Sequence, residues 1–172
     1  MQIVIRPASS EDGSAIREIE WSAGERFRDV GLPEIAEDEP PSAEILARYA
    51  EDGRSWVAVD QADNPIGYVI VDVVDGNAHI EQVSVHPDHQ GTGVGRALLE
   101  HVRAWAAAAD LPAVTLMTFT DVPWNAPLYR HLGFRVLGEN DLGLELWALR
   151  DAEASHGLDP ARRVCMRWEV PR

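Results

Sequence analysis

Three glycines that alternate along the chain are the residues best suited to chemistry. Gly91, Gly93 and Gly95 stand between a β-type run that ends at Val85 and a segment with helical apolar spacing. Glycines allow backbone angles with φ > 0 and place no Cβ in the way of a ligand. The first N–H groups of a helix lack partners within the helix, and the helix dipole favours an anion there. This segment therefore predicts a cradle for a pyrophosphate group.

The spacing of the glycines distinguishes between kinds of phosphate cradle. A dinucleotide fingerprint needs G-x-G-x-x-G directly after a strand, and a P-loop ends in G-K-[ST]. Here the order is Gln90-x-x-Gly93-x-Gly95, and Arg96 and Ala97 follow, so no hydroxyl is available for Mg²⁺. The same spacing disfavours a nicotinamide oxidoreductase. A glycine-rich turn at a helix start, without a ligand, is the structural alternative.

The Gln-x-x-Gly-x-Gly order after a strand resembles the acetyl-coenzyme A loop of the GNAT superfamily of N-acetyltransferases. The segment 128–134, Leu-Tyr-Arg-His-Leu-Gly-Phe, is similar to this family too, as is the order of predicted elements over roughly residues 3–170. The resemblance implies an acetyl-CoA-dependent N-acetyltransferase. Such an enzyme moves an acetyl group from the thioester to a primary amine by direct attack in a ternary complex.

The resemblance also implies which residues contact the cofactor. The N–H groups of the loop would bind the phosphates while Gln90 braces the turn; Arg96 either adds a charge-assisted contact or is a solvated arginine. The strand before the loop would offer backbone groups to the pantetheine and the thioester oxygen. Family members often carry an Asn where this chain has Val122, so Asn125 either replaces it or only caps a helix. The predicted cofactor-binding residues are Val83, Ser84, Val85, Gln90, Gly91, Thr92, Gly93, Val94, Gly95, Arg96 and Asn125.

Acetyl transfer also requires that protons move. An amine with a pKa of about 10.4 is mostly protonated at pH 7 and cannot attack until it loses a proton. Glu81 stands where family members often place a general base, acting directly or through a water. Tyr129 stands where they often carry the acid that protonates the leaving thiolate. The structural alternatives are an exposed strand carboxylate and an aromatic ring packed on the core, and Asp88 and Asp121 are weaker candidate bases.

The elements that must position these residues follow from periodicity and turn residues. The predicted surface loop covers residues 32–41, and the first helix should end at Gly24 or Gly31. The order predicts an α/β fold in one domain over residues 1–172, with a mixed, twisted and partly antiparallel sheet flanked by helices. The GNAT resemblance adds a splay between the fourth and fifth strands. Strands are predicted near 3–6, 56–59, 66–73, 78–85, 114–117, 134–137 and 164–170, and helices near 9–24, 42–53, 93–109, 123–131 and 142–156.

Composition excludes several classes of partner. The chain has 172 residues, of which 45% are hydrophobic and 26% charged, as in a globular domain. No apolar run is long enough for a membrane span, and the N-terminus has a strand pattern instead of a signal peptide. A net charge of −14 argues against nucleic acid. One cysteine fits a cytoplasmic location, and the histidines show no metal-binding spacing, so no metal is predicted.

The nature of the acceptor is predicted from charge together with the GNAT resemblance, which implies that residues 32–41 overhang the acceptor side of the cleft. Four carboxylates crowd the predicted loop between Pro33 and Pro40, and they favour a small cationic amine or a peptide amine, unless they form only a solvated acidic surface. They are Glu34, Glu37, Asp38 and Glu39. Because many GNAT members dimerise, a homodimer is a further expectation. Two alternative functions remain open: acyl transfer to an oxygen acceptor or of a longer acyl chain, and a non-catalytic acyl-CoA-binding sensor, which would need the loop but neither Glu81 nor Tyr129.

Overall fold

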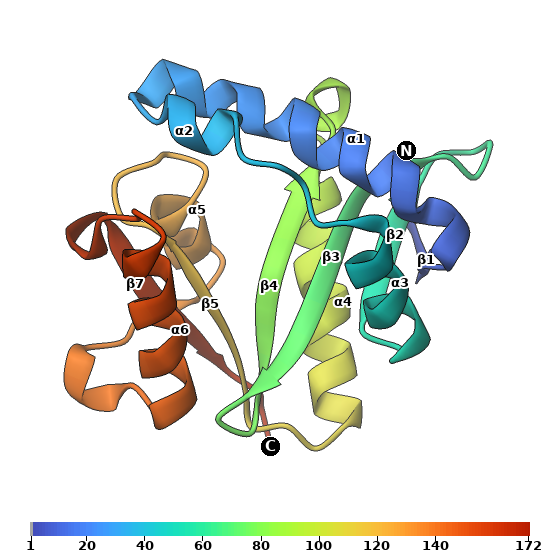
Figure 1. Ribbon diagram of the computed structural model, residues 1–172. Coiled ribbons are helices and arrows are strands. Elements are labelled where there is room, and N and C mark those ends of the chain that lie inside the picture. The colour runs from blue at the N-terminus through green and yellow to red at the C-terminus, as the bar shows by residue number, and fades with distance from the viewer. Residues whose placement is uncertain (1) are drawn as a thin grey trace. The chain divides into compact units, whose positions relative to one another are not determined.

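The computed structural model describes residues 2–172 (Figure 1). The chain divides into two compact units. The first unit contains the residues up to Val71 together with Gln82–His101, and the second contains Asp72–Glu81 and Val102–Arg172. The boundaries fall inside two strands and one helix, so these elements contribute to both units. One domain over residues 1–172 stays a prediction.

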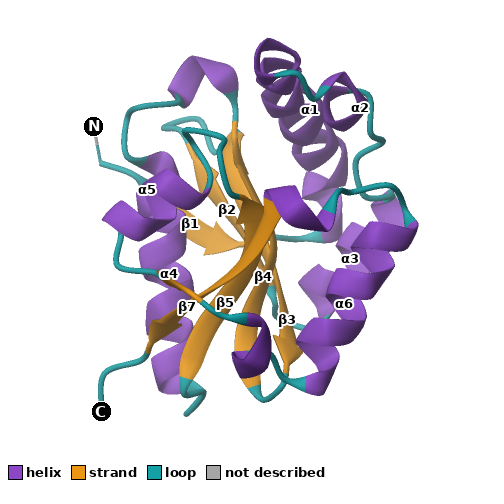
Figure 2. Ribbon diagram, turned by 90° about the vertical axis from the view of Figure 1, so that its left-hand side faces the viewer, coloured by secondary structure: helices purple, strands orange, loops and turns teal. Residues whose placement is uncertain are grey.

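The strands form one seven-stranded sheet in the order β1-β2-β3-β4-β5-β7-β6. Strands β4 and β5 are parallel, whereas β1 and β2, β2 and β3, β5 and β7, and β6 and β7 pair antiparallel. Figure 2 shows the twist of the strands, and the predicted mixed, partly antiparallel sheet is confirmed. The strands are β1 (Val4–Pro7), β2 (Ser55–Val59), β3 (Pro65–Val74), β4 (Asn77–Val85), β5 (Ala113–Phe119), β6 (Arg135–Val136) and β7 (Arg163–Glu169).

The registered pairs of β4 with β5 lie in the first half of β4. They run from Ala78 opposite Val114 to Ile80 opposite Leu116. The splay between the fourth and fifth strands stays a prediction.

In the first unit, three helices accompany strands β1 to β3. They are α1 (Gly13–Gly24), α2 (Pro33–Ala36) and α3 (Ala43–Glu51). A 3₁₀ segment, Glu25–Val30, follows α1 directly and is capped by Gly31. Of the two predicted helix ends, Gly24 therefore ends the α-helix and Gly31 ends the 3₁₀ segment. Helix α2 corrects the prediction that residues 32–41 form only a loop. Pro33 occupies its first turn, where the fixed φ favours a helix and the missing N–H costs nothing.

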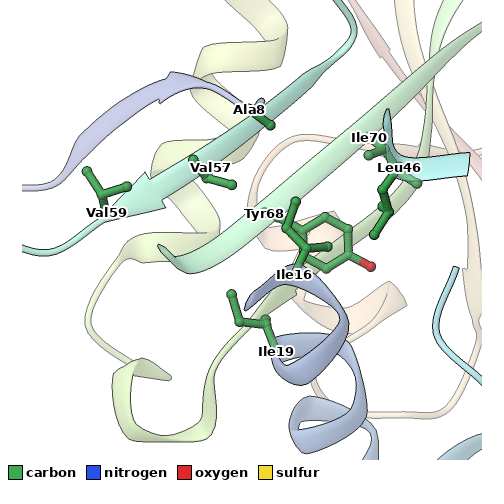
Figure 3. Close-up of a cluster of buried hydrophobic side chains, with 8 residues drawn as sticks. All are labelled: Ala8, Ile16, Ile19, Leu46, Val57, Val59, Tyr68 and Ile70. Carbon is green, nitrogen blue, oxygen red and sulfur yellow. The ribbon is translucent and has the colours of Figure 1, made fainter. Parts of the chain in front are cut away.

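Apolar side chains of α1 and α3 pack against β2 and β3 (Figure 3). Ile16 and Ile19 are buried as the periodicity predicts. Ala23 continues this stripe, whereas Trp21 is 46% exposed and lies off it. The cluster contains Ala8, Ile16, Ile19, Leu46, Val57, Val59, Tyr68 and Ile70.

Helix α4 (Val94–Ala108) begins close to β3 because that strand carries a glycine. A Cβ on Gly67 would lie 3.0 Å from Val94 Cγ1, 3.2 Å from Leu98 Cδ1 and 3.2 Å from the Ser84 carbonyl oxygen. Val94 and Leu98 are buried, as expected for the apolar face of a helix. Neighbouring strand residues point to opposite faces of the sheet. Tyr68 therefore packs against α1 on one face, and the missing side chain of Gly67 leaves room for α4 on the other.

The second unit contains helices α5 (Ala126–His131) and α6 (Leu144–Ser155) with strands β5 to β7. The turn predicted at residues 75–77 caps α6 from outside. The Asp75 carboxylate accepts hydrogen bonds from the N–H groups of Glu145 (2.9 Å) and Leu146 (3.1 Å). In return, Glu145 Oε1 accepts from the N–H group of Asp75 at 3.3 Å. This reciprocal cap fixes the start of α6. Within residues 2–172, no helix is long and apolar enough to cross a membrane.

Candidate active site

The glycine loop joins β4 to α4 within the first unit. Gly91 and Gly93 have φ values of 76° and 90°, in the left-handed region that glycine adopts most readily. A Cβ on Gly91 would meet nothing within 4 Å, and one on Gly93 only Ile3 Cδ1 at 3.9 Å. The backbone conformation therefore requires the glycines, and no side chain crowds their outer face.

The start of α4 presents unpaired backbone donors. The first helical hydrogen bond runs from the Ala97 N–H to the Gly93 carbonyl, at 3.0 Å. The N–H groups of Val94, Gly95 and Arg96 precede it, so no helical carbonyl is available to them. Three successive donors at a helix start, next to exposed glycines, fit the chemistry of a pyrophosphate.

Two side-chain hydrogen bonds hold the loop closed. Gln90 Nε2 donates to the Val85 carbonyl at 3.1 Å, which is the bracing predicted for Gln90. The Thr92 hydroxyl donates to the His89 carbonyl. Thr92 and Arg96 are themselves exposed. These hydrogen bonds restrict the shape of the loop, and a restricted loop loses less conformational entropy when it binds a ligand.

The last residues of β4 are more exposed to solvent than its first residues. Residues 77–80 are buried, whereas residues 82–85 all keep part of their surface exposed. A Cβ on Gly95 would lie 3.6 Å from Val85 Cγ2, so Val85 faces α4. Gln82 and Ser84 instead bond the same residue of α1, so the side chains of this part of β4 alternate between two faces.

That residue of α1 is Glu20, which the sequence analysis missed. Its Oε2 accepts from the Tyr68 hydroxyl and the Ser84 hydroxyl, both at 2.6 Å. Its Oε1 accepts from Gln82 Nε2 at 2.9 Å. The sequence held one local signal, because Glu20 lies four residues after buried Ile16 and so projects from nearly the same side of the helix.

Glu81 is a carboxylate whose pKa is raised to about 7. Desolvation by neighbouring protein atoms is the largest cause, and the like charges of Asp72 and Glu153 add to it, while Arg163 opposes them. The side chain as a whole is exposed. Glu153 holds Arg163 in a bidentate ion pair, with distances of 3.0 and 2.7 Å. Glu81 is therefore reachable and titrates close to neutral pH.

In the second unit, the shifted pKa values of His79 and Cys165 make both side chains unsuitable for catalysis at neutral pH. His79 is buried, accepts or donates at Thr115 Oγ1 over 2.8 Å, and has its pKa lowered to about 4, chiefly by desolvation. It is neutral and a weak base at pH 7. Burial raises the pKa of the Cys165 thiol to about 11, with a further contribution from Glu153. Because the thiolate is the nucleophilic form, Cys165 is unsuited to forming an acyl intermediate.

Tyr129 and Asn125 both belong to the α5 region of the second unit. Tyr129 is half-buried, and its ring meets Phe134 edge-to-face at a centroid distance of 5.9 Å. Asn125 precedes α5, but its side chain does not cap the helix. Asn125 Oδ1 instead accepts from Thr118 Oγ1 (2.8 Å) and the Phe119 N–H (3.3 Å) of β5. Its Nδ2 group takes no part in these bonds.

The weaker base candidates have other surroundings. Asp88 is exposed and lies 3.7 Å from the His86 ring. Both oxygens of Asp121 accept from Arg162 Nη2 at 3.3 Å. Neither carboxylate has the desolvated setting of Glu81. Over residues 2–172, no group of three or more His, Cys, Asp or Glu residues could hold a metal ion.

Comparison with known proteins identifies the class. The model of the "Acetyltransferase (GNAT) family" matches residues 14–134, which is more than half of the chain. The chain belongs to this family, and it is an acyltransferase of the N-acetyltransferase class.

Individual relatives agree with this assignment. The chain is 27% identical over 143 residues to the peptidyl-lysine N-acetyltransferase YjaB of Escherichia coli, covering 83% of this chain and 88% of that protein. A GNAT-family acetyltransferase from Staphylococcus aureus superimposes with a TM-score of 0.73 at 16% identity, covering 99% and 100% of the two chains. The PaiA N-acetyltransferase of Thermoplasma acidophilum, solved in complex with coenzyme A, gives 0.70 at 16% identity, covering 98% and 99%. These structures share the fold.

Proposed function

We propose that the chain is an acetyl-CoA-dependent N-acetyltransferase that acts on a primary amine by direct attack in a ternary complex. The observation that carries this proposal is the exposed glycine loop at the start of α4, with φ values of 76° and 90° at Gly91 and Gly93, in a chain of the GNAT family. Glu81, whose pKa is raised to about 7, lies on the strand that leads into this loop. A general base works best when its pKa lies near the operating pH. A sensor that only binds acyl-CoA has no use for such a group.

Each step of the reaction has a residue to serve it. When bound, acetyl-CoA supplies the acetyl thioester. The Glu81 carboxylate accepts a proton from the acceptor ammonium, directly or through a water, which leaves the nitrogen lone pair free to attack the carbonyl carbon. Backbone N–H groups of residues 83–85 stabilise the negative charge that develops on the carbonyl oxygen. As the C–S bond breaks, the Tyr129 hydroxyl donates a proton to the sulfur, and the second proton that leaves the nitrogen passes through water to the Tyr129 phenolate and restores the phenol.

The cofactor contacts are proposed on the geometry of the loop. The N–H groups of Gly91 to Arg96 would bind the pyrophosphate, with Gln90 bracing the turn. Asn125 would offer its Nδ2 group, since its Oδ1 is engaged by β5. The PaiA structure supports coenzyme A as the ligand because it was solved with that molecule on the same fold.

Direct attack is favoured over an acyl-enzyme because of the cysteine. Cys165 is the only cysteine of the sequence, and it is buried with a pKa of about 11. The acceptor is proposed to be a lysine side chain of a peptide or a small amine, since the relative YjaB is named a peptidyl-lysine N-acetyltransferase. A homodimer and a cytoplasmic location remain predictions.

The test is a screen of acceptors with acetyl-CoA, measured by release of free thiol. Lysine peptides and small alkylamines should give release, whereas serine peptides and alcohols should not. The sequence contains no lysine, so acetylation of its own ε-amines cannot add to the signal. Thiol release with alcohols and not with amines would favour transfer to an oxygen acceptor. If none of the acceptors tested gives free thiol, the result would favour the non-catalytic binding module.

Binding at the loop is tested by Gly93→Val. A branched Cβ cannot adopt φ 90° without strain and would cover the donors, so calorimetry should show that affinity for coenzyme A is lost. Gly157→Val is the matched control, because Gly157 has φ 94° and nothing within 4 Å of its Cβ position. Unchanged affinity in a folded Gly93→Val protein would contradict the loop as the cofactor site.

A further inference from the structure

The Glu20 carboxylate is surrounded by groups that leave its charge uncompensated. Its three donors are a phenol, a hydroxyl and an amide, from Tyr68, Ser84 and Gln82. Within the described chain, no arginine or histidine pairs with it. Hydrogen bonds from neutral donors do not cancel the charge of a carboxylate. Glu20 is half-buried, so this charge is screened less than one on the open surface.

Packing explains the presence of a hydrogen-bond acceptor but not of a charge. The Tyr68 ring is buried beside Ile16 (Figure 3), so its hydroxyl needs an acceptor. A glutamine oxygen at position 20 would meet that need without a half-buried charge. A carboxylate held only by neutral donors keeps a full negative charge that a cation can pair with. The arrangement is therefore suited to a positively charged ligand.

The network places this charge beside the reactive strand. Gln82 and Ser84, which both donate to Glu20, flank Val83 on β4. The backbone of residues 83–85 is the proposed site of the thioester carbonyl. Gln82 Nε2 also donates to Ser84 Oγ at 3.2 Å, which ties the two side chains to each other. Residues 82–85 keep part of their surface exposed, so a ligand can approach them.

We propose that Glu20 binds the protonated amine of the acceptor and thereby selects cationic substrates. This assignment rests on the proposed N-acetyltransferase function, which it deepens by naming the charge of the substrate. Glu20 accepts a hydrogen bond from the ammonium, and Tyr68, Ser84 and Gln82 hold its carboxylate in place.

Binding can be measured without turnover by using coenzyme A in place of acetyl-CoA. Butylammonium and its uncharged counterpart n-butanol serve as probes, titrated by NMR into the protein loaded with coenzyme A. Glu20→Gln keeps the size of the side chain and an acceptor for Tyr68 but loses the charge. It should weaken butylammonium binding about 10- to 100-fold, the range of a lost charge-assisted hydrogen bond. Binding of n-butanol and of coenzyme A should be unchanged.

Three further variants separate this role from a structural one. Glu18→Gln removes the same charge from an exposed position of the same helix and should leave both probes unaffected. Tyr68→Phe removes one neutral donor and should keep the preference for the cation. Glu20→Asp keeps the charge on a shorter side chain, so it should lose less affinity than Glu20→Gln, and it replaces that variant if the latter does not fold.

The outcomes separate this proposal from the proposed function. If thiol release shows amine acetylation while Glu20→Gln retains full affinity for butylammonium, the role of Glu20 is wrong and the acetyltransferase stands. Equal binding of butylammonium and n-butanol by the wild-type protein would also overturn it. Loss of cation selectivity in Glu20→Gln alone, with the KM for acetyl-CoA unchanged, supports it.

Discussion

At the scale of residues, the surroundings of Glu81 make an ordinary carboxylate into a base for neutral pH. Removing a general base typically lowers the rate by about 10² to 10⁴. We expect Glu81→Gln to lower turnover by this order at pH 7 and to leave calorimetric binding of coenzyme A intact. The loss should shrink at high pH, because the acceptor then deprotonates without help.

The raised pKa of Glu81 also predicts the shape of the pH profile. Below a pH of about 7 the carboxyl is protonated and cannot accept a proton, so kcat/KM should rise through this region as pH increases. Asp72→Asn removes a like charge that raises the pKa of Glu81, so the rise should move to lower pH. Because Glu81 is exposed, the displacement should be modest and smaller in high salt. A profile that is the same in both proteins would show that Glu81 is not the titrating group.

Tyr129 should matter less than Glu81. A phenol with a pKa near 10 donates uphill to a thiolate whose conjugate acid has a pKa near 8.5, so the catalytic gain is limited. Tyr129→Phe keeps the ring against Phe134 and removes only the hydroxyl. We expect a smaller loss of kcat than for Glu81→Gln, with an unchanged KM for acetyl-CoA. Wild-type turnover in both variants would reject the acid and base assignment and favour the binding module.

At the scale of elements, the cap on α6 links parts of the chain that are far apart in sequence. Asp75 accepts from two N–H groups at the first turn of the helix. Loss of a helix cap typically costs about 0.5–2 kcal/mol. Asp75→Ala should therefore lower the free energy of unfolding by at least this order, since alanine also tolerates φ 51° poorly.

The control for this cap is Asp75→Asn. Asparagine tolerates the positive φ and keeps one acceptor oxygen, so it should lose less stability than alanine. Urea denaturation measures both variants, with the midpoint compared at equal m-value. Equal midpoints for the alanine variant and the wild type would mean that the cap adds nothing to stability.

Local sequence patterns predicted the helices and strands but not the contacts between residues that are far apart in the chain. The glycine loop and α4 follow from neighbouring residues, since the spacing of the glycines and the stripe from Val94 to Ala106 are visible in the sequence. The first turn of α2 was missed because an acidic, proline-rich stretch is typical of a loop. Glu20 and Asp75 act on residues 48 to 71 positions away, which no local pattern reveals.

The candidate site divides in the same way. The family motifs pointed to Gln90, Glu81 and Tyr129, and the bracing by Gln90 is confirmed. The pKa of Glu81 could not be predicted, because it depends first on desolvation by the folded chain and then on the charges of Asp72, Glu153 and Arg163 from three other elements. Of the two roles left open for Asn125, the helix cap is contradicted, since its side chain bonds β5 in place of the helix, and the cofactor contact stays a prediction.

At the scale of the whole molecule, a net charge of −14 favours the capture of cations. The four carboxylates of residues 34–39 should contribute, although Glu37 already pairs with Arg28 at 3.1 Å. Neutralising all four should raise the KM for a cationic amine a few-fold and leave kcat unchanged, since long-range attraction acts on capture. The control neutralises four exposed carboxylates elsewhere, at Glu100, Asp110, Asp141 and Asp151.

Salt separates this long-range effect from the contact at Glu20. The acidic segment is exposed, so about 0.5 M salt should raise the wild-type KM to that of the quadruple variant. The effect of Glu20→Gln should survive the same salt, because a half-buried carboxylate in direct contact with the ammonium is screened less. Two results would contradict electrostatic steering by the acidic segment: a best substrate that is anionic, or a quadruple variant whose KM depends on salt as that of the wild type does. Neither result would contradict the acetyltransferase function.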